Sequence, residues 1–171
     1  PDMQKQAVIV GEALPAMYSG ADPDPENVAV LSSLEKTPVG RCKDTLYGER
    51  APKDGASHCI DFISCLTCRS FAVVGAQEDL HRLFSFQLFL FEQSGHPSSE
   101  WASYCHKLVA AIDEFVAQHF ERRLVDDAKA RALLSPLRFW KRVSGGTSQK
   151  TPPAQQVELT PSDALAQRHA A

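Results

Sequence analysis

Four cysteines gathered in one loop-like stretch constrain this chain more than any other feature. They are Cys42, Cys59, Cys65 and Cys68. The residues between the first two, like those just before them, are rich in Pro and Gly, which makes regular secondary structure improbable there. Backbone pairing alone is therefore a poor candidate for holding these loops in place. The sequence predicts an irregular four-cysteine loop module over residues 37–75 that needs another source of order.

A structural zinc ion is one such source. Cys65 and Cys68 form a Cys-x-x-Cys pair, and this spacing lets both sulfur atoms reach one zinc from a tight turn, at about 2.3 Å each. Cys42 and Cys59 can complete a tetrahedral four-thiolate site if the loop folds back over the pair. Such a zinc would contribute about 10 kcal/mol or more to folding, which would offset the entropy lost on ordering the loops. We therefore expect a structural zinc bound by these four cysteines.

Other interpretations of the cysteines and nearby histidines stay open. Free cysteine is among the most buried residue types, so Cys65 and Cys68 could simply be small core residues. A redox pair is a third interpretation, although no strand-then-helix pattern of the thioredoxin kind leads into Cys65. His58 and His81 are possible substitute ligands, but each is better explained as a surface or capping residue. Cys105 falls on the apolar stripe of a helix and is expected in the core.

Helical periodicity dominates the second half of the chain. Residues 80–91 are apolar on nearly every side of a helix, which places that helix inside a core or an interface. The apolar spacing over 101–119 predicts an amphipathic helix, and 122–134 continues or restarts it, with Pro136 marking the end. These segments form a predicted helical module over residues 76–143. The expected fold class is mainly α, a small helical module with an irregular cysteine-rich loop.

The remaining segments are assigned by composition. Residues 1–18 carry apolar side chains at helical spacing and predict a helix continuing from an upstream domain, although Gly11 weakens it and Pro15 should kink or end it. Residues 19–36 have the Pro, Gly and Asp content of a linker. Residues 144–171 are polar and poor in aromatic side chains, so we expect a disordered tail.

The charge distribution allows only local contacts with nucleic acid. A net charge of −3 gives no overall attraction to DNA. The C-terminal helical region is locally basic, and Lys and Arg side chains that displace counterions supply most non-specific DNA affinity. The alternative is a solvated helix face with Trp140 packed on the core. The candidate phosphate-contacting residues are Arg122, Arg123, Lys129, Arg131, Arg138, Lys141 and Arg142.

The sequence offers no segment of membrane-spanning character. No apolar run reaches the roughly 18–20 residues that a bilayer span requires. The first residues lack the pattern of a signal peptide, and the absence of an initiator Met indicates a piece of a larger protein. We expect a cytoplasmic protein, in which thiols stay reduced and a cysteine cluster favours metal binding over disulfides.

Four segments together resemble a known family. They are GRCKD at 40–44, APKDG at 51–55, CIDFISCLTCRSFAVV at 59–74 and DLHRLFSF at 79–86. This pattern, over about residues 38–90, resembles the C-terminal extension of large bacterial phage-type integrases, the tyrosine site-specific recombinases of mobile elements. The resemblance implies an accessory region that follows the recombinase catalytic domain in the bacterial cytoplasm and supports DNA integration, with that domain and double-stranded DNA as partners.

The catalytic residues of that family are not expected here. Its members cleave DNA with a tyrosine nucleophile, supported by arginines and a His-x-x-Arg motif. His119 and Arg122 match the motif by spacing, but the family places the tyrosine after it, and no tyrosine follows Tyr104. His119 also lies on the apolar stripe of a helix. We therefore expect this chain to be non-catalytic.

Two rival functions follow from the same residues. The first is a protein-interaction or assembly module with no DNA contact, which would use the aromatic helix 80–91 as an interface, including for self-association. The second is a redox enzyme that uses Cys65 and Cys68. An unusually acidic cysteine in the metal-free protein would support the second.

Overall fold

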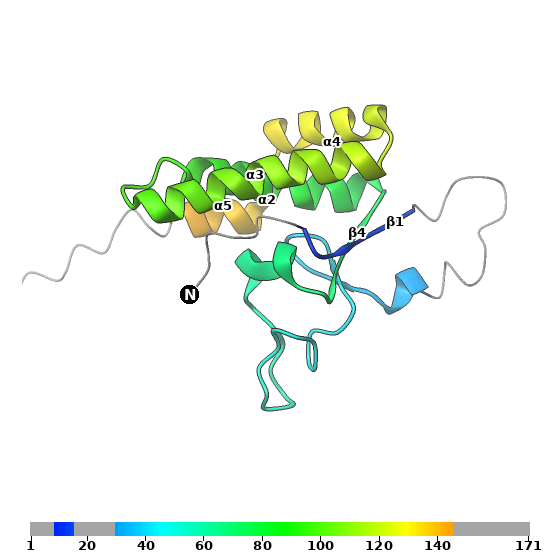
Figure 1. Ribbon diagram of the computed structural model, residues 1–171. Coiled ribbons are helices and arrows are strands. Elements are labelled where there is room, and N and C mark those ends of the chain that lie inside the picture. Colours follow the sequence, from blue (N-terminus) through cyan, green and yellow to red (C-terminus); the bar gives the residue numbers. More distant parts are fainter. Residues whose placement is uncertain (1–8, 16–29, 146–171) are drawn as a thin grey trace, which may run out of the picture.

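The computed structural model of the chain describes residues 9–15 and 30–145. The fold is mainly helical, as the sequence predicts, and it also contains a small four-stranded sheet that was not predicted. Helices α2 to α5 gather in one layer, the sheet lies beside them, and the cysteine-rich loops extend from the sheet away from the helices (Figure 1). Within the described residues, no helix combines the length and the apolar character that crossing a membrane would require.

Helix α2 (Gln77–Gln93) is the centre of the helical layer. It contacts α3 (Ser99–His119), α4 (Arg122–Leu134), α5 (Arg138–Gly145) and the sheet. This surrounding explains its composition, because a helix that is covered on several sides can carry apolar residues nearly all round. Its fully or almost fully buried apolar side chains are Leu80, Leu83, Phe84, Phe86, Phe89 and Leu90. The aromatic helix is therefore mainly a core element.

Helix α5 extends the helical layer slightly beyond the predicted boundary. The sequence predicts that the 122–134 helix ends at Pro136, that the helical module ends at 143 and that a disordered tail begins at 144, whereas α5 runs to Gly145. The physical reason is Trp140, which is 3% exposed and packs its ring 4.7 Å from that of Phe86. Its indole N–H also donates a hydrogen bond to the Pro38 carbonyl at 3.1 Å. The rest of the predicted tail, 146–171, lies outside the described residues.

The sheet has the strand order β1-β4-β3-β2. Its strands are β1 (Glu12–Leu14), β2 (Glu35–Lys36), β3 (Arg41–Cys42) and β4 (Phe71–Val74). Strand β1 pairs with β4 in parallel, while the other two pairs are antiparallel. All four residues of β4 are buried, because alternate side chains enter two different apolar clusters, the larger one shared with the helices and a smaller one with Leu31 and Leu34.

The predicted helix over residues 1–18 is wrong where the structure describes it. Residues 9–15 are not helical, and 12–14 form strand β1. A glycine explains this difference: a Cβ atom on Gly11 would lie 2.7 Å from the carbonyl oxygen of Phe71, so the chain approaches β4 more closely than other residues allow. Residues 1–8 and 16–18 lie outside the described part.

The predicted linker and loop module contain several short elements of regular structure. Of residues 19–36, the described part forms a helical turn at 30–33 and strand β2, and 19–29 lie outside the description. Within 37–75, strands β3 and β4 and the 3-10 helix η1 (Phe62–Thr67) interrupt an otherwise irregular path. These short elements bring the cysteines together.

Candidate metal centre

Backbone hydrogen bonds fold the four cysteines toward one another. The N–H of Cys68 donates to the carbonyl of Cys65 at 3.0 Å, which closes the tight turn predicted for the Cys-x-x-Cys pair. Cys42 is paired with Phe71 in the β3–β4 ladder and so lies beside the segment that follows Cys68. The N–H of Cys59 donates to the carbonyl of Thr45 at 2.8 Å, which returns the long loop to the end of β3.

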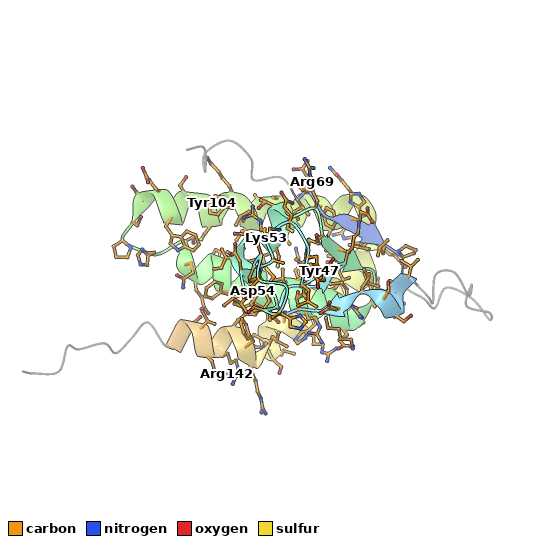
Figure 2. The ribbon with its side chains drawn as sticks, turned by 90° about the horizontal axis from the view of Figure 1, so that it is seen from below. Tyr47, Lys53, Asp54, Arg69, Tyr104 and Arg142 are labelled. Atoms are coloured by element: carbon orange, nitrogen blue, oxygen red, sulfur yellow. The ribbon has the colours of Figure 1, made fainter. Side chains whose placement is uncertain are left out.

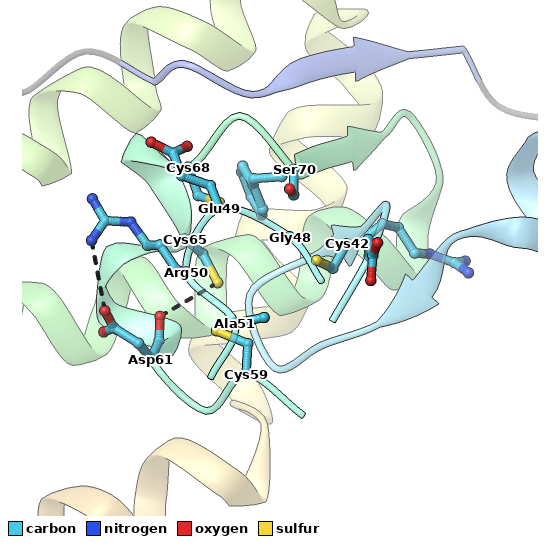
Figure 3. Close-up of a pocket in the computed structure, with 13 residues that line it drawn as sticks. Cys42, Gly48, Glu49, Arg50, Ala51, Cys59, Asp61, Cys65, Cys68 and Ser70 are labelled. Atoms are coloured by element: carbon cyan, nitrogen blue, oxygen red, sulfur yellow. Dashed lines mark hydrogen bonds and ion pairs between the residues drawn. The ribbon is translucent and has the colours of Figure 1, made fainter. Parts of the chain in front are cut away.

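The four cysteines line a single small cavity. Figure 3 shows them around it, together with residues of the loop that covers it. The cavity has a volume of about 20 Å³, which is room for one water molecule or one ion and little more. Cys68 is buried, and Cys42, Cys59 and Cys65 are half-buried. No cysteine forms a disulfide, so all four thiols remain available as ligands.

As the side chains stand, the thiols do not form a closed ligand set. Within the described residues, no group of three or more His, Cys, Asp or Glu side chains is placed so that it could hold a metal ion. A zinc site would require the sulfur atoms to close in to bonds of about 2.3 Å. The four cysteines line one cavity of about the size of an ion, and their side chains would have to move before they could bind one metal together.

Burial controls the protonation of these thiols. It raises the pKa of Cys65 to about 12, and the nearby thiols of Cys59, Cys42 and Cys68 act in the same direction. Burial also raises the pKa of Cys42, against a backbone hydrogen bond at Asp44 that lowers it. The thiols of Cys65 and Cys42 therefore stay neutral near neutral pH when no metal is bound. A redox nucleophile needs the opposite shift, so this arrangement disfavours the redox interpretation.

Charged residues line part of the cavity and form ion pairs. The guanidinium of Arg50 lies 3.8 Å from the carboxylate of Asp61, and both residues line the cavity (Figure 3). On the other side, Arg41 makes a two-point contact with Asp79 at the start of α2, at 2.5 and 3.0 Å. Asp79 is almost completely buried, so this ion pair ties the strand before Cys42 to the helical layer. The sequence shows a cation, Arg41, beside Cys42, but it does not indicate that Asp79 is the partner of this cation.

The two histidines considered as substitute ligands do not line the cavity. His58 is exposed, and its Nδ1 lies 2.5 Å from the hydroxyl of Thr45 and 3.7 Å from the carboxylate of Glu35. His81 is buried, and its Nε2 lies 2.7 Å from the Ser135 carbonyl, so it holds the turn after α4 against α2. Both have structural contacts, which agrees with the surface or capping roles expected from the sequence.

The two residues of the His-x-x-Arg match lie at the end of α3 and the start of α4. His119 ends α3, with its ring stacked 4.6 Å from that of Phe115 and its Nδ1 2.9 Å from the Phe115 carbonyl. Arg122 begins α4 with a side chain that is 95% exposed and lies 3.7 Å from Asp126. Cys105 is fully buried on α3, as expected for a core residue, and burial raises its pKa to about 11.

The seven candidate phosphate-contacting residues do not gather in one place. Lys129 is already engaged, with its ammonium 2.6 Å from Asp113 and 5.3 Å from the ring centroid of Phe84. On α5, three cations follow at i, i+3 and i+4 and share one face; they are Arg138, Lys141 and Arg142. Figure 2 shows Arg142 projecting away from the body of the protein. The other cations are exposed along α4; they are Arg122, Arg123 and Arg131.

The aromatic side chains near these cations have different surroundings. Trp140 is buried in the core, which is the alternative that the sequence left open. Phe139 is half-buried and packs edge-on against Phe62, at 5.4 Å between ring centroids. Neither ring is presented for stacking on nucleic-acid bases.

Comparisons with known proteins give no match, since no family model, no curated protein and no solved structure is significantly similar to this chain. The functional argument therefore depends on the geometry of the chain itself and on the sequence resemblance.

Proposed function

We propose that this chain is a non-catalytic accessory region of an integrase-like tyrosine recombinase, stabilised by a structural zinc ion. The observation that carries the proposal is the convergence of four cysteines on one ion-sized cavity, in the same segment that resembles the integrase extension. The expected partners are the recombinase catalytic domain and double-stranded DNA, in the bacterial cytoplasm. Its role would be to orient or regulate the catalytic part on DNA.

The donor set fits a structural zinc better than a catalytic one. Four thiolates from Cys42, Cys59, Cys65 and Cys68 would fill a tetrahedral coordination sphere and leave no open position for a substrate. Bound there, the ion would fasten the long loop between Cys42 and Cys59 to the turn of η1. That loop contributes little to the apolar core, so a metal is a suitable source of its order.

The DNA part of the proposal is tested by duplex binding at two salt concentrations. We expect weak binding that falls steeply with salt, since contacts of Lys and Arg with phosphates release counterions. Replacing Arg138, Lys141 and Arg142 together by Gln should reduce the slope of log K against log salt by up to about 3, because each lost phosphate contact removes about 0.9. Helical circular dichroism checks that the variant folds.

A matched variant makes this test specific. Replacing Arg122, Arg123 and Arg131 together by Gln removes the same charge from α4, where the cations are spread along the helix. We expect a smaller change in slope for this variant than for the α5 variant. Absence of duplex binding by the unmodified chain at low salt would contradict a DNA contact and would favour the assembly function.

One surface feature supports the assembly function as the alternative. Between α2, α3 and α4 lies an open groove of about 370 Å³ that includes Leu88, Phe91 and Leu133. Phe91 is 60% and Leu133 68% exposed, whereas most of the aromatic helix is core. Self-association would therefore use this groove, and a concentration-dependent mass that Phe91→Ser abolishes would support it.

A further inference from the structure

Strand β1 occupies a built slot at the edge of the sheet. Three residue pairs join it to β4 in parallel, from Glu12 opposite Ala72 to Leu14 opposite Val74. Two further backbone hydrogen bonds extend the contact, from the N–H of Val10 to the Leu66 carbonyl at 2.9 Å and from the N–H of Gly75 to the Leu14 carbonyl at 2.8 Å. Backbone pairing thus continues beyond both ends of the short strand.

Side chains give this slot selectivity. A Cβ at Gly11 would lie 2.6 Å from the ring and 2.7 Å from the carbonyl oxygen of Phe71, so the slot requires glycine at this place in the strand. Glu12 forms an ion pair with Lys43 at 2.7 Å; both side chains are exposed, so the pair gives only a modest preference for an acidic residue next to the glycine. Ile9 and Ala13 pack on the main core, while Leu14 packs on the smaller apolar cluster.

The slot belongs to the part of the chain that begins at residue 30. Strand β4 is completely buried, and β3 covers only one of its edges, so removal of β1 would leave a row of unpaired backbone groups beside Phe71–Val74. An exposed edge of this kind binds extended peptides by adding a strand. Figure 1 shows β1 beside β4 at the border of the sheet.

We propose that the slot beside β4 can bind residues 9–15 of a second copy of this chain in place of the chain's own strand β1. Exchange of this kind replaces each contact by an identical one, so it costs little apart from association. The chain's own strand competes at the high effective concentration that covalent connection provides. The proposal requires neither the zinc ion nor a recombinase.

The test uses one substitution in the full chain that should keep residues 9–15 out of the slot. Gly11→Val should prevent the chain's own strand from docking, because the added side chain meets the backbone of Phe71. A fluorescent peptide of residues 7–16 should then bind this variant saturably in an anisotropy titration. We expect it to bind the unmodified chain at least tenfold more weakly, and a Gly11→Val peptide to bind the variant at least tenfold more weakly. Circular dichroism reports whether the helices remain.

Charge reversal in the vacated slot provides a second variant. Adding Lys43→Glu to the Gly11→Val chain should favour the peptide that carries Glu12→Lys over the unmodified peptide, whereas the Gly11→Val chain alone should show the opposite preference. Equal binding of all peptides to both variants, or no binding while the helices remain folded, would overturn the proposal. Loss of the helices in both variants would also overturn it, because the slot is proposed to belong to a unit that stays folded when its own strand leaves.

Discussion

Cys65 is the residue on which the candidate metal site depends most. It lies within η1, and its carbonyl accepts the hydrogen bond that closes the turn to Cys68. Among the four cysteines that line the cavity, it has the most strongly raised pKa, about 12. Its thiol must lose a proton before it can bind a metal. Both the affinity and the pH dependence of the site should therefore respond to this residue.

Replacement of Cys65 by Ser should abolish tight zinc binding. The serine hydroxyl is a poor zinc ligand, so we expect the zinc affinity to fall at least about 100-fold, the upper end of what loss of an outer-shell partner costs. Competition with a chromophoric chelator measures the affinity. Cys105→Ala is the matched control, because Cys105 is buried on α3 and does not line the cavity. It should keep the zinc, and equal zinc affinities for the two variants would contradict the site.

Zinc affinity should rise steeply with pH. Burial and the neighbouring thiols raise the pKa of Cys65 to about 12, and burial raises that of Cys42, so both thiols are protonated at neutral pH without metal. Zinc binding releases these protons, and lowering the pH therefore opposes binding. We expect the affinity to fall more than tenfold for each pH unit between about pH 8 and 6, because more than one proton is released. A flat profile would contradict thiolate ligation.

At the scale of elements, Trp140 is the buried side chain that anchors α5 to the core. Trp140 fills the space beside Phe86 and Phe89, with 4.8 Å between its ring centroid and that of Phe89, and reaches the Pro38 carbonyl. Trp140→Ala should cost about 3–5 kcal/mol of unfolding free energy. Trp140→Phe should cost less, since it keeps most of the packing and loses the hydrogen bond, worth about 1 kcal/mol. Urea denaturation measures both, and equal costs for the two variants would contradict this account.

The elements that could be predicted are those encoded locally. Helices α2 and α3 follow from the periodicity of their own residues, and the turn between Cys65 and Cys68 follows from their spacing. Strand β1 could not be predicted, because its apolar spacing also suits a helix and its partner β4 lies far along the chain. The contact that anchors α5 could not be predicted for the same reason, since the Pro38 carbonyl that binds Trp140 is remote in sequence.

In the candidate site too, local features could be predicted and long-range contacts could not. The sequence identified the four cysteines, but the position of Cys42 depends on the pairing of β3 with β4, and that of Cys59 on a hydrogen bond to Thr45. Neither contact leaves a local pattern. The sequence also could not predict how the cations are distributed over α4 and α5, or that Lys129 forms an ion pair with Asp113.

At the scale of the whole molecule, the cysteine-rich loops and the helices share one core. A single cluster of buried residues runs from Val39, Leu66 and Cys68 through β4 to α2, α3, α4 and Trp140. The two predicted modules therefore meet across a continuous apolar contact. Order imposed on the loops by a zinc ion should consequently be felt by the helices, and its loss should lower the stability of the entire described fold.

The most direct test of this account is the zinc content of the purified protein, measured by elemental analysis before and after treatment with a strong chelator. The account predicts about one zinc per chain before treatment, and a clear fall in the melting temperature of the helices when the chelator removes it. A protein that holds no zinc when purified in its presence, and whose melting temperature the chelator leaves unchanged, would contradict the central claim. The four cysteines would then be ordinary residues of the core.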